Sequence, residues 1–367
     1  MTFRYADGVK ARLQAGLPFP VPQHRMQAPS RLAGISSNEV EMSFTRTLLA
    51  AAFLAGSALS AMADDTITVY TSQPQDQMMA VINAFNAEHP DIKVELFRSG
   101  TTEVMAKLQA EYAAGKSPAD VVLIADTIAM TELKNADRLY ALTDAPVDGI
   151  DPAFLDQDKT FFGTKVITTG IVYNTNLVKT APTSWNDLLA ADAAKSLIMP
   201  SPLYSGAAVI HVGTVVQQPE FGWSYLEKLA AGGAVAGQGN GTVIEAVARG
   251  EKAYGIIIEY MALNAKKKGS PVDFVFPKEG VSSITQPVAV LKDSDSLEAA
   301  KTFVKWQLSK AAQEQAASQG YFPILPGVAQ PAGYPDLKTL KILPADSASM
   351  LADDKKNKEQ FADIFGG

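Results

Sequence analysis

The chain has 367 residues, of which 47% are hydrophobic and 19% are charged, and its formal net charge is −7. This composition is typical of a folded globular protein and excludes an intrinsically disordered chain. The acidic balance is poorly suited to nucleic acid or anionic membranes, and the absence of cysteine excludes disulfides, thiol catalysis and thiolate metal sites. A small anion remains a possible ligand, because a local cluster of hydrogen-bond donors can bind it against the net charge.

Residues 42–63 have the pattern of a secretory signal peptide. A basic lead containing Arg46 precedes an apolar run over 48–59, and Ala61-Met62-Ala63 gives a small-residue cleavage site. The run is roughly a dozen residues long, too short for the ~20 that a transmembrane helix needs. We therefore expect cleavage after Ala63 and a soluble mature protein in the periplasm. Residues 1–41 precede the natural start at Met42, and we interpret them as an over-extended gene start that is not part of the mature protein.

Strand and helix patterns alternate in the first part of the mature chain. Apolar strands are predicted at 66–70, 92–97 and 121–124, and helices with apolar residues at helical spacing at 75–89 and 103–114. This repeated order of strand, turn and helix predicts a mostly parallel sheet with helices on both faces.

A second α/β set follows, entered by a strand at 164–174. Its predicted strands are 197–199, 253–258 and 271–276, with helices after Ser205 and after Thr242. A strand at 286–291 and a helical stretch at 296–319 then return to the first set. The predicted fold class is therefore α/β, with one lobe from 64–168 and 280–367, a second lobe from 169–279, two crossover segments as a hinge, and a ligand cleft between the lobes.

Three turns that lead from a strand into a helix carry candidate binding residues. Ser205, Gly206 and Ala207 open one helix, where Ser205 can act as N-cap and Gly206 lets a ligand approach unpaired backbone N–H groups. An ordinary helix cap is the alternative. The other two turns contribute Ser72 with Gln73, and Thr101 with Thr102; three such turns in one cleft would form an oxyanion-binding site.

Two carboxylates follow predicted buried strands. Glu259 and Tyr260 stand directly after the strand at 253–258, and together they can hold an ammonium group by charge and by cation–π attraction. Asp126 is a second candidate of this kind. The alternative for Glu259 and Tyr260 is a helix cap beside a packed tyrosine.

Catalytic and metal-binding patterns have little support. No Gly-x-Ser-x-Gly turn is present, and His89 and His211 are the histidines that follow the signal peptide. Neither an adjacent pair of tyrosines nor a cluster of histidines indicates a metal site. We predict no catalytic residues, no metal ligands and no cofactor.

Residues 66 to about 328 resemble the extracellular solute-binding proteins of ABC importers, in the branch that includes ferric-binding and 2-aminoethylphosphonate-binding proteins. The most specific segment is 259–280 (EYMALNAKKKGSPVDFVFPKEG), supported by 68–71 (TVYT), 117–122 (SPADVV) and 198–202 (IMPSP). Where the ferric branch has adjacent tyrosines, this chain has the single Tyr260. The resemblance is therefore closest to the aminoethylphosphonate branch.

This resemblance implies a type II periplasmic-binding-protein fold and a receptor that closes on a small zwitterion. Backbone N–H and hydroxyl groups would hold the phosphonate and a carboxylate the amine. The implied partner is an ABC transporter permease in the inner membrane, with the receptor acting as a monomer and not as an enzyme. A ferric-iron receptor, a receptor for sugar phosphates or other organic anions, and a secreted phosphoester hydrolase remain the alternatives.

Overall fold

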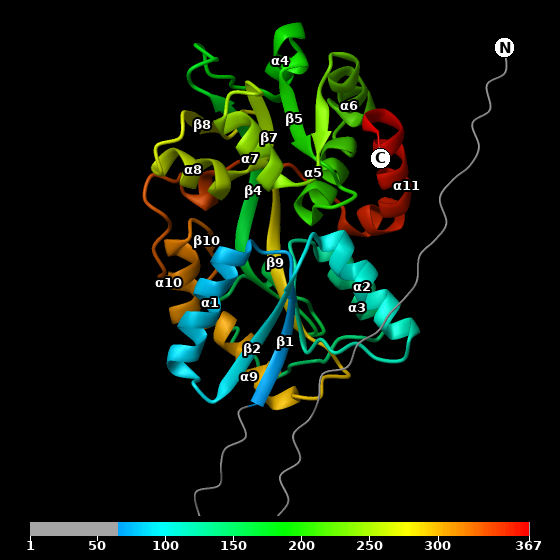
Figure 1. Cartoon of the computed structure of the whole chain (residues 1–367), viewed down its shortest axis with the longest axis vertical. Coiled ribbons are helices and arrows are strands. Elements are labelled where there is room, and N and C mark those ends of the chain that lie inside the picture. Colours follow the sequence, from blue (N-terminus) through cyan, green and yellow to red (C-terminus); the bar gives the residue numbers. More distant parts are fainter. Residues whose placement is uncertain (1–64, 367) are drawn as a thin grey trace, which may run out of the picture. The chain divides into compact units, whose positions relative to one another are not determined.

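The computed structural model describes residues 65–366, so the predicted signal peptide and residues 1–41 lie outside the described residues. The ten strands of the described chain form one mixed sheet in the order β2-β1-β3-β9-β4-β7-β5-β6, with β8 and β10 each paired to β4. Helices pack on both faces of this sheet (Figure 1). Between residues 65 and 366, no helix has the length and hydropathy needed to span a bilayer.

The first lobe begins with strand–helix units. They are β1 (Asp65–Thr71), α1 (Gln75–Glu88), β2 (Ile92–Arg98), α2 (Thr101–Ala113), β3 (Val121–Leu123) and α3 (Thr127–Asn135). Strand β1 pairs in parallel with β2 and β3. Because side chains alternate between the faces of a strand, Val69 of β1 shares a core cluster with Phe85 of α1, whereas Tyr70 joins Leu108 of α2 on the other face. The predicted strands and helices of this region are confirmed.

Two long strands connect the lobes, β4 (Phe162–Asn174) and β9 (Ser282–Val290). The first part of β4 pairs with β9 and with β10 (Phe322–Pro323), and its last part pairs with β7 (Tyr254–Ile258) and β8 (Val272–Val275). The end of β9 pairs with β3. These strands are the two crossover segments expected from the sequence. The parallel pairing predicted for the first part of the mature chain is confirmed for β1, β2 and β3, whereas every pairing of β4 and β9 is antiparallel, so the sheet as a whole is mixed.

The second lobe surrounds the far end of β4. It contains α4 (Ala191–Lys195), β5 (Leu197–Pro200), α5 (Gly206–Val216), α6 (Gly222–Ala231), β6 (Val235–Gly237), α7 (Asn240–Ala248) and α8 (Glu259–Lys267). One core cluster joins α7 and α8 to one face of the sheet, and another joins α5 and α6 to the opposite face. Helices α6, α7 and α8 each bury one face, whereas α5 is buried from Gly206 to Val215 and contributes residues to both clusters.

The last part of the chain returns to the first lobe and then crosses back. The helical stretch expected at 296–319 is two helices, α9 (Leu297–Gln307) and α10 (Lys310–Ser318), because Ser309 begins a new helix by accepting a hydrogen bond from the N–H of Ala312 (3.2 Å). Short 3-10 helices occur at Pro152–Phe154, Trp185–Leu189 and Leu337–Thr339.

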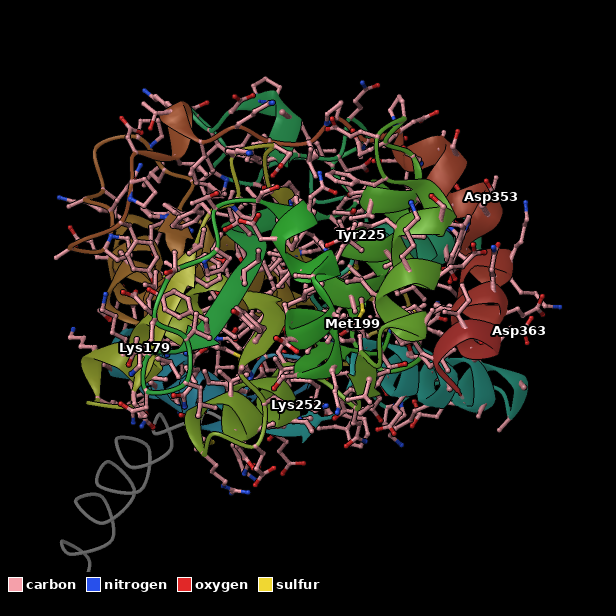
Figure 2. The ribbon with its side chains drawn as sticks, turned by 90° about the horizontal axis from the view of Figure 1, so that it is seen from above. Lys179, Met199, Tyr225, Lys252, Asp353 and Asp363 are labelled. Carbon is pink, nitrogen blue, oxygen red and sulfur yellow. The ribbon has the colours of Figure 1, made fainter. Side chains whose placement is uncertain are left out.

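The final helix, α11 (Ser347–Phe365), packs against α5 and α6 of the second lobe and also against α3 of the first. Its residue Phe361 is fully buried in the cluster that contains Trp185, while Asp353 and Asp363 lie on its outer face (Figure 2). The lobe boundaries given above stay predictions, and α11 belongs by its packing mainly with the second lobe.

Candidate ligand-binding site

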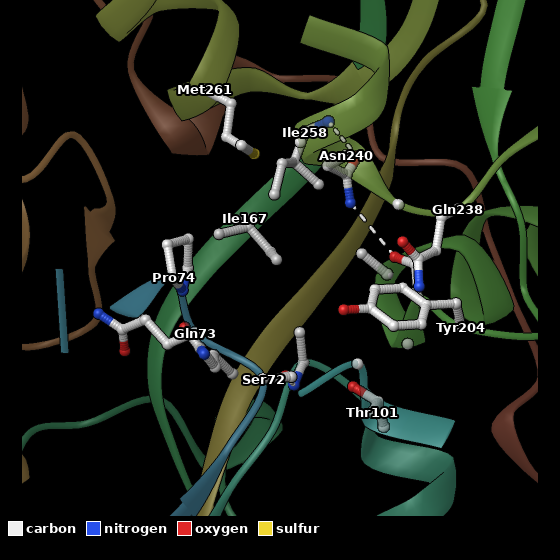
Figure 3. A pocket seen from close by; sticks show the side chains of 18 of the residues that line it. Ser72, Gln73, Pro74, Thr101, Ile167, Tyr204, Gln238, Asn240, Ile258 and Met261 are labelled. Carbon is white, nitrogen blue, oxygen red and sulfur yellow. Dashed lines mark hydrogen bonds between the residues drawn. The ribbon is translucent and has the colours of Figure 1, made fainter. Parts of the chain in front are cut away.

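A cavity of about 410 Å³ lies between the two lobes. Its walls come from the loop after β1, the starts of α2, α5 and α7, and the loop before β10. In Figure 3, Ser72 and Thr101 lie on one side of the cavity, and Asn240, Ile258 and Met261 lie on the opposite side. The strand ends and helix starts therefore meet where the fold rule for open α/β sheets predicts a ligand.

The start of α5 offers free backbone donors to this cavity. The first hydrogen bond of the helix runs from the N–H of Val209 to the carbonyl of Ser205 (3.0 Å), so Gly206 and Ala207 precede the helical ladder. The Ser205 hydroxyl oxygen accepts hydrogen bonds from the N–H of Ala208 (3.4 Å) and from Asn240 Nδ2 (3.2 Å). Its own hydrogen is left to donate, and all three sequence-predicted residues of this turn line the cavity.

The start of α2 faces α5 from the other lobe. The Thr101 side chain is 2% exposed, lines the cavity, and its Oγ1 has no hydrogen-bond partner in the described chain. The neighbouring Thr102 points elsewhere, because its hydroxyl donates to the carbonyl of Pro202 (3.4 Å). Thr101 therefore belongs to the cavity as expected, and Thr102 serves as a contact between lobes.

The loop after β1 forms the third part of the wall. The Ser72 Oγ accepts a hydrogen bond from the N–H of Ala125 (2.9 Å), which leaves its hydrogen free to donate. The buried Gln73 side chain accepts from Lys165 Nζ (2.9 Å) and donates to Gln319 Oε1 (3.4 Å). Both predicted residues line the cavity.

Among the residues that line the cavity, Arg98 is the one cation and Glu245 the one carboxylate. Arg98 lies at the end of β2, and its guanidinium donates to the carbonyl of Gln73 (3.2 Å) and to the hydroxyl of Tyr204 (3.4 Å). Glu245 is exposed on α7 and pairs with Arg249 (3.3 Å). Sequence reasoning missed both residues, although the position of Arg98 directly before the Ser99-Gly100 turn was an available signal.

Glu259 lies outside the cavity wall. It is fully buried, and its Oε2 accepts a hydrogen bond from the N–H of Thr168 (2.6 Å). Burial raises the pKa of Glu259 to about 8. Its neighbour Tyr260 does line the cavity. The structure thus places Glu259 as a buried group at the start of α8, and its position does not support the amine-binding role expected from the sequence.

Asp126 also faces away from this cavity. Its Oδ1 accepts hydrogen bonds from the N–H groups of Ile128 (2.8 Å) and Ala129 (3.2 Å), so it is the N-cap of α3. Together with Thr102 it lines a second cavity, of about 520 Å³, between α2, α3 and α11. Burial raises the pKa of Asp126 to about 7. Its placement is that of a helix cap and not that of a ligand group in the first cavity.

Three tyrosines, Tyr204, Tyr260 and Tyr321, line the cavity. The rings of Tyr260 and Tyr321 have centroids 4.2 Å apart, and burial raises the pKa of both hydroxyls. Within residues 65–366, no group of three or more histidine, cysteine, aspartate or glutamate side chains is arranged to hold a metal ion. The buried tyrosines therefore offer neutral hydroxyl groups at physiological pH.

Residues 71–314 match the family model of the bacterial extracellular solute-binding protein, and the chain belongs to this family. It is 28% identical over 310 residues to the Fe(3+)-binding periplasmic protein of Serratia marcescens, covering 81% of this chain and 89% of the relative. It is 25% identical over 309 residues to a probable ABC transporter periplasmic-binding protein of Sinorhizobium fredii, y4fP, covering 81% and 84%.

A solved structure gives a similar result for the fold. The periplasmic binding protein AfuA of Actinobacillus pleuropneumoniae, with bound fructose-6-phosphate, aligns with a TM-score of 0.74 and 24% identity, over 82% of this chain and 98% of that chain. The predicted periplasmic-binding-protein fold is therefore confirmed.

Proposed function

We propose that this protein is the periplasmic receptor of an ABC importer and binds a small organophosphonate, with 2-aminoethylphosphonate as the first candidate. The periplasmic location is supported by the relatives from S. marcescens and S. fredii, both of which are periplasmic binding proteins, and by the predicted signal peptide. Its partner would be the inner-membrane permease, to which it delivers the ligand as a monomer. In this role it binds its ligand and does not transform it.

The observation that carries the proposal is the convergence of donors from both lobes on one cavity. The starts of α2, α5 and α7 meet there, and each places the positive end of a helix dipole towards the same space. The Thr101 hydroxyl is buried and has no hydrogen-bond partner among residues 65–366, which is costly unless a ligand satisfies it. A tetrahedral anion with three oxygens suits such a set of donors better than a planar or apolar ligand.

For the amine of an aminated ligand, the accessible carboxylate is Glu245. It is exposed at the rim of the cavity, whereas Glu259 is buried and bonded to the backbone of Thr168. On binding, an ammonium group would compete with Arg249 for the Glu245 carboxylate. Tyr260 remains available to contact the methylene groups of the ligand.

Ferric iron, which the S. marcescens relative is named for, is a less favourable cargo here. Tyrosinate ligands must lose a proton, and burial raises the pKa of Tyr260 and Tyr321. The cavity wall also holds one carboxylate, that of Glu245. A sugar phosphate, as bound to AfuA, would use the same donors for its phosphate, so we include it as a competing ligand.

A thermal-shift panel tests the proposal, because a ligand that binds the folded state raises the melting temperature. The panel contains 2-aminoethylphosphonate, methylphosphonate, inorganic phosphate, fructose-6-phosphate and ferric citrate. We expect the largest shift with a phosphonate and no release of phosphate on incubation. A shift confined to ferric citrate, accompanied by visible colour, would refute the phosphonate proposal. A shift confined to fructose-6-phosphate would identify a sugar phosphate, and not a phosphonate, as the ligand.

The Glu245→Gln variant then tests the amine site. We expect this variant to weaken the binding of 2-aminoethylphosphonate by about tenfold and to leave the binding of methylphosphonate unchanged, because only the first ligand carries a cation. Glu259→Gln is the matched control and should affect both ligands equally. Equal losses for the two ligands in Glu245→Gln would remove Glu245 from this role.

A further inference from the structure

A lysine is buried directly behind the cavity wall. Lys165, on β4, is 1% exposed, and it is the one lysine or arginine among the buried polar side chains of the described chain. Its Nζ donates to Gln73 Oε1 (2.9 Å) and lies 4.5 Å from the centroid of the Tyr321 ring. In the described chain, no carboxylate lies within ion-pair distance of it, although buried cations are normally paired.

The surroundings of Lys165 connect it to the ligand space. Both of its partners, Gln73 and Tyr321, line the cavity, and so does Ile167, which projects from the same face of β4 two residues further on. Burial without a counter-charge lowers the pKa of Lys165 to about 7. The missing negative charge is therefore the one that an anion in the cavity would supply.

The other titratable groups near Lys165 do not replace that charge. Tyr321 precedes β10, and Tyr260 comes from α8; burial raises the pKa of both, so they are neutral near pH 7. Glu259 of α8 and Asp76 of α1 act electrostatically on these tyrosines, whereas desolvation alone accounts for the lowered pKa of Lys165. The side chains that reach this region from β9 and α10, including Gln286 and Gln319, are uncharged.

We infer that Lys165 is the counter-charge for an anion held in the cavity, that it positions Gln73 for this anion, and that it takes up a proton when the anion binds. The inference rests on the proposed function insofar as the ligand must be an anion. It does not depend on whether that anion is a phosphonate or a phosphate ester. Lys165 acts through Gln73 and through its charge, so it is a positioning residue and not a direct contact.

The direction of the pH effect follows from linkage. An anion favours the charged form of Lys165, so the pKa of this lysine is higher in the complex than in the empty protein. Below pH 7 the lysine is already charged and binding takes up no proton. As the pH rises above 7, binding must add a proton and the affinity falls, until the lysine is neutral in both states.

The test compares wild type with Lys165→Met, a neutral side chain of similar length, in isothermal titrations from pH 6 to pH 9. The probe is methylphosphonate or, where the panel above selects it, fructose-6-phosphate. The probe itself also ionises in this pH range, but its ionisation affects wild type and Lys165→Met equally. It therefore cancels in the ratio of the wild-type affinity to the variant affinity at each pH. At pH 6 we expect the affinity of wild type for the probe to be at least about tenfold higher than that of the variant. This ratio of affinities should fall towards one at pH 9.

A second measurement counts the protons directly, first in wild type and then in two variants. Titrations at pH 8 in two buffers of different ionisation enthalpy report the number of protons taken up on binding. We expect wild type to take up protons. The Glu259→Gln variant should retain this uptake, and Lys165→Met should lose it. A ratio that is the same at every pH would assign Lys165 a purely structural role and overturn the inference. If wild type binds none of the anions, the proposed function fails and the inference with it; if wild type binds but shows no linked uptake, only the inference fails.

Discussion

A methyl group added at Gly206 tests whether the contact between the lobes governs binding. A Cβ at this position would lie 2.5 Å from the carbonyl oxygen of Ala125, 2.6 Å from Thr101 Oγ1 and 2.7 Å from Asp126 Cβ. Gly206 belongs to α5 of the second lobe, and all three atoms belong to the first. The glycine was predicted to make room for a ligand, and the structure shows that its missing side chain also makes room for the opposite lobe.

The expected loss can be estimated from the cost of overpacking. Inserting a methyl group into a filled space costs about 1–3 kcal/mol, and every 1.4 kcal/mol is a factor of ten in Kd. Because the strain arises only where the lobes meet, Gly206→Ala should raise the Kd of the ligand by about 5- to 150-fold. Each lobe keeps its own core, so the variant should remain folded.

Gly241→Ala is the matched control, measured by the same isothermal titration. Gly241 lines the same cavity, and an added Cβ there has no heavy atom within 4 Å. The Kd of the Gly241→Ala variant should stay within about twofold of the wild-type value, because the added methyl group contacts no neighbouring atom. Unchanged binding in Gly206→Ala, or an equal loss in both variants, would refute the argument that close contact of the lobes accompanies binding.

Three further variants test the charges and the C-terminal helix. Arg98→Gln should weaken an anionic ligand several-fold at low salt and less at 0.5 M salt, because this guanidinium is exposed and screened; a loss independent of salt would contradict a charge effect. Folding raises the pKa of Glu259 from 4.5 to about 8, so the folded protein binds a proton more tightly than the unfolded chain. The stability that this proton contributes is complete below about pH 4.5 and is lost as the pH rises from there through 8. Urea unfolding should therefore find Glu259→Gln more stable than wild type at pH 9 and little changed at pH 5; equal changes at both values would exclude this titration. Phe361→Ala, at a fully buried position of α11, should lower the free energy of unfolding by about 3–5 kcal/mol, whereas Asp363→Ala on the exposed face should change it by less than about 0.5; equal effects of the two would show that α11 is not docked.

Local patterns predicted most of the secondary structure of residues 65–366. The strands 66–70 and 92–97 and the helix 75–89 were recognisable because their apolar residues recur with the period of the element. Ser205 was recognisable as a cap, since a serine before a helix satisfies an N–H of the first turn. The division of 296–319 into two helices was missed, because no proline or glycine marks the break at Ser309.

Several of the predicted binding residues line the cavity, and those that lie outside its wall do so for a common reason. Ser72, Thr101 and Ser205 were found because turns at strand ends have a sequence signature. Glu259 also follows a strand, but its carboxylate turns back to the backbone of Thr168, 91 residues away. The direction of a side chain at a strand end depends on partners that are remote in the chain, and local spacing carries no information about them.

By itself, the sequence determined the order of strands and helices and the turns at which the helices begin, because these depend on neighbours within a few residues. Only the tertiary structure decided that β4 and β9 join the lobes in antiparallel register, that Arg98 and Glu245 border the cavity, and that Lys165 lies behind Gln73, 92 residues away. Such contacts depend on burial and packing between distant segments. The free energy of a buried charge is set by these segments and not by its neighbours in the chain.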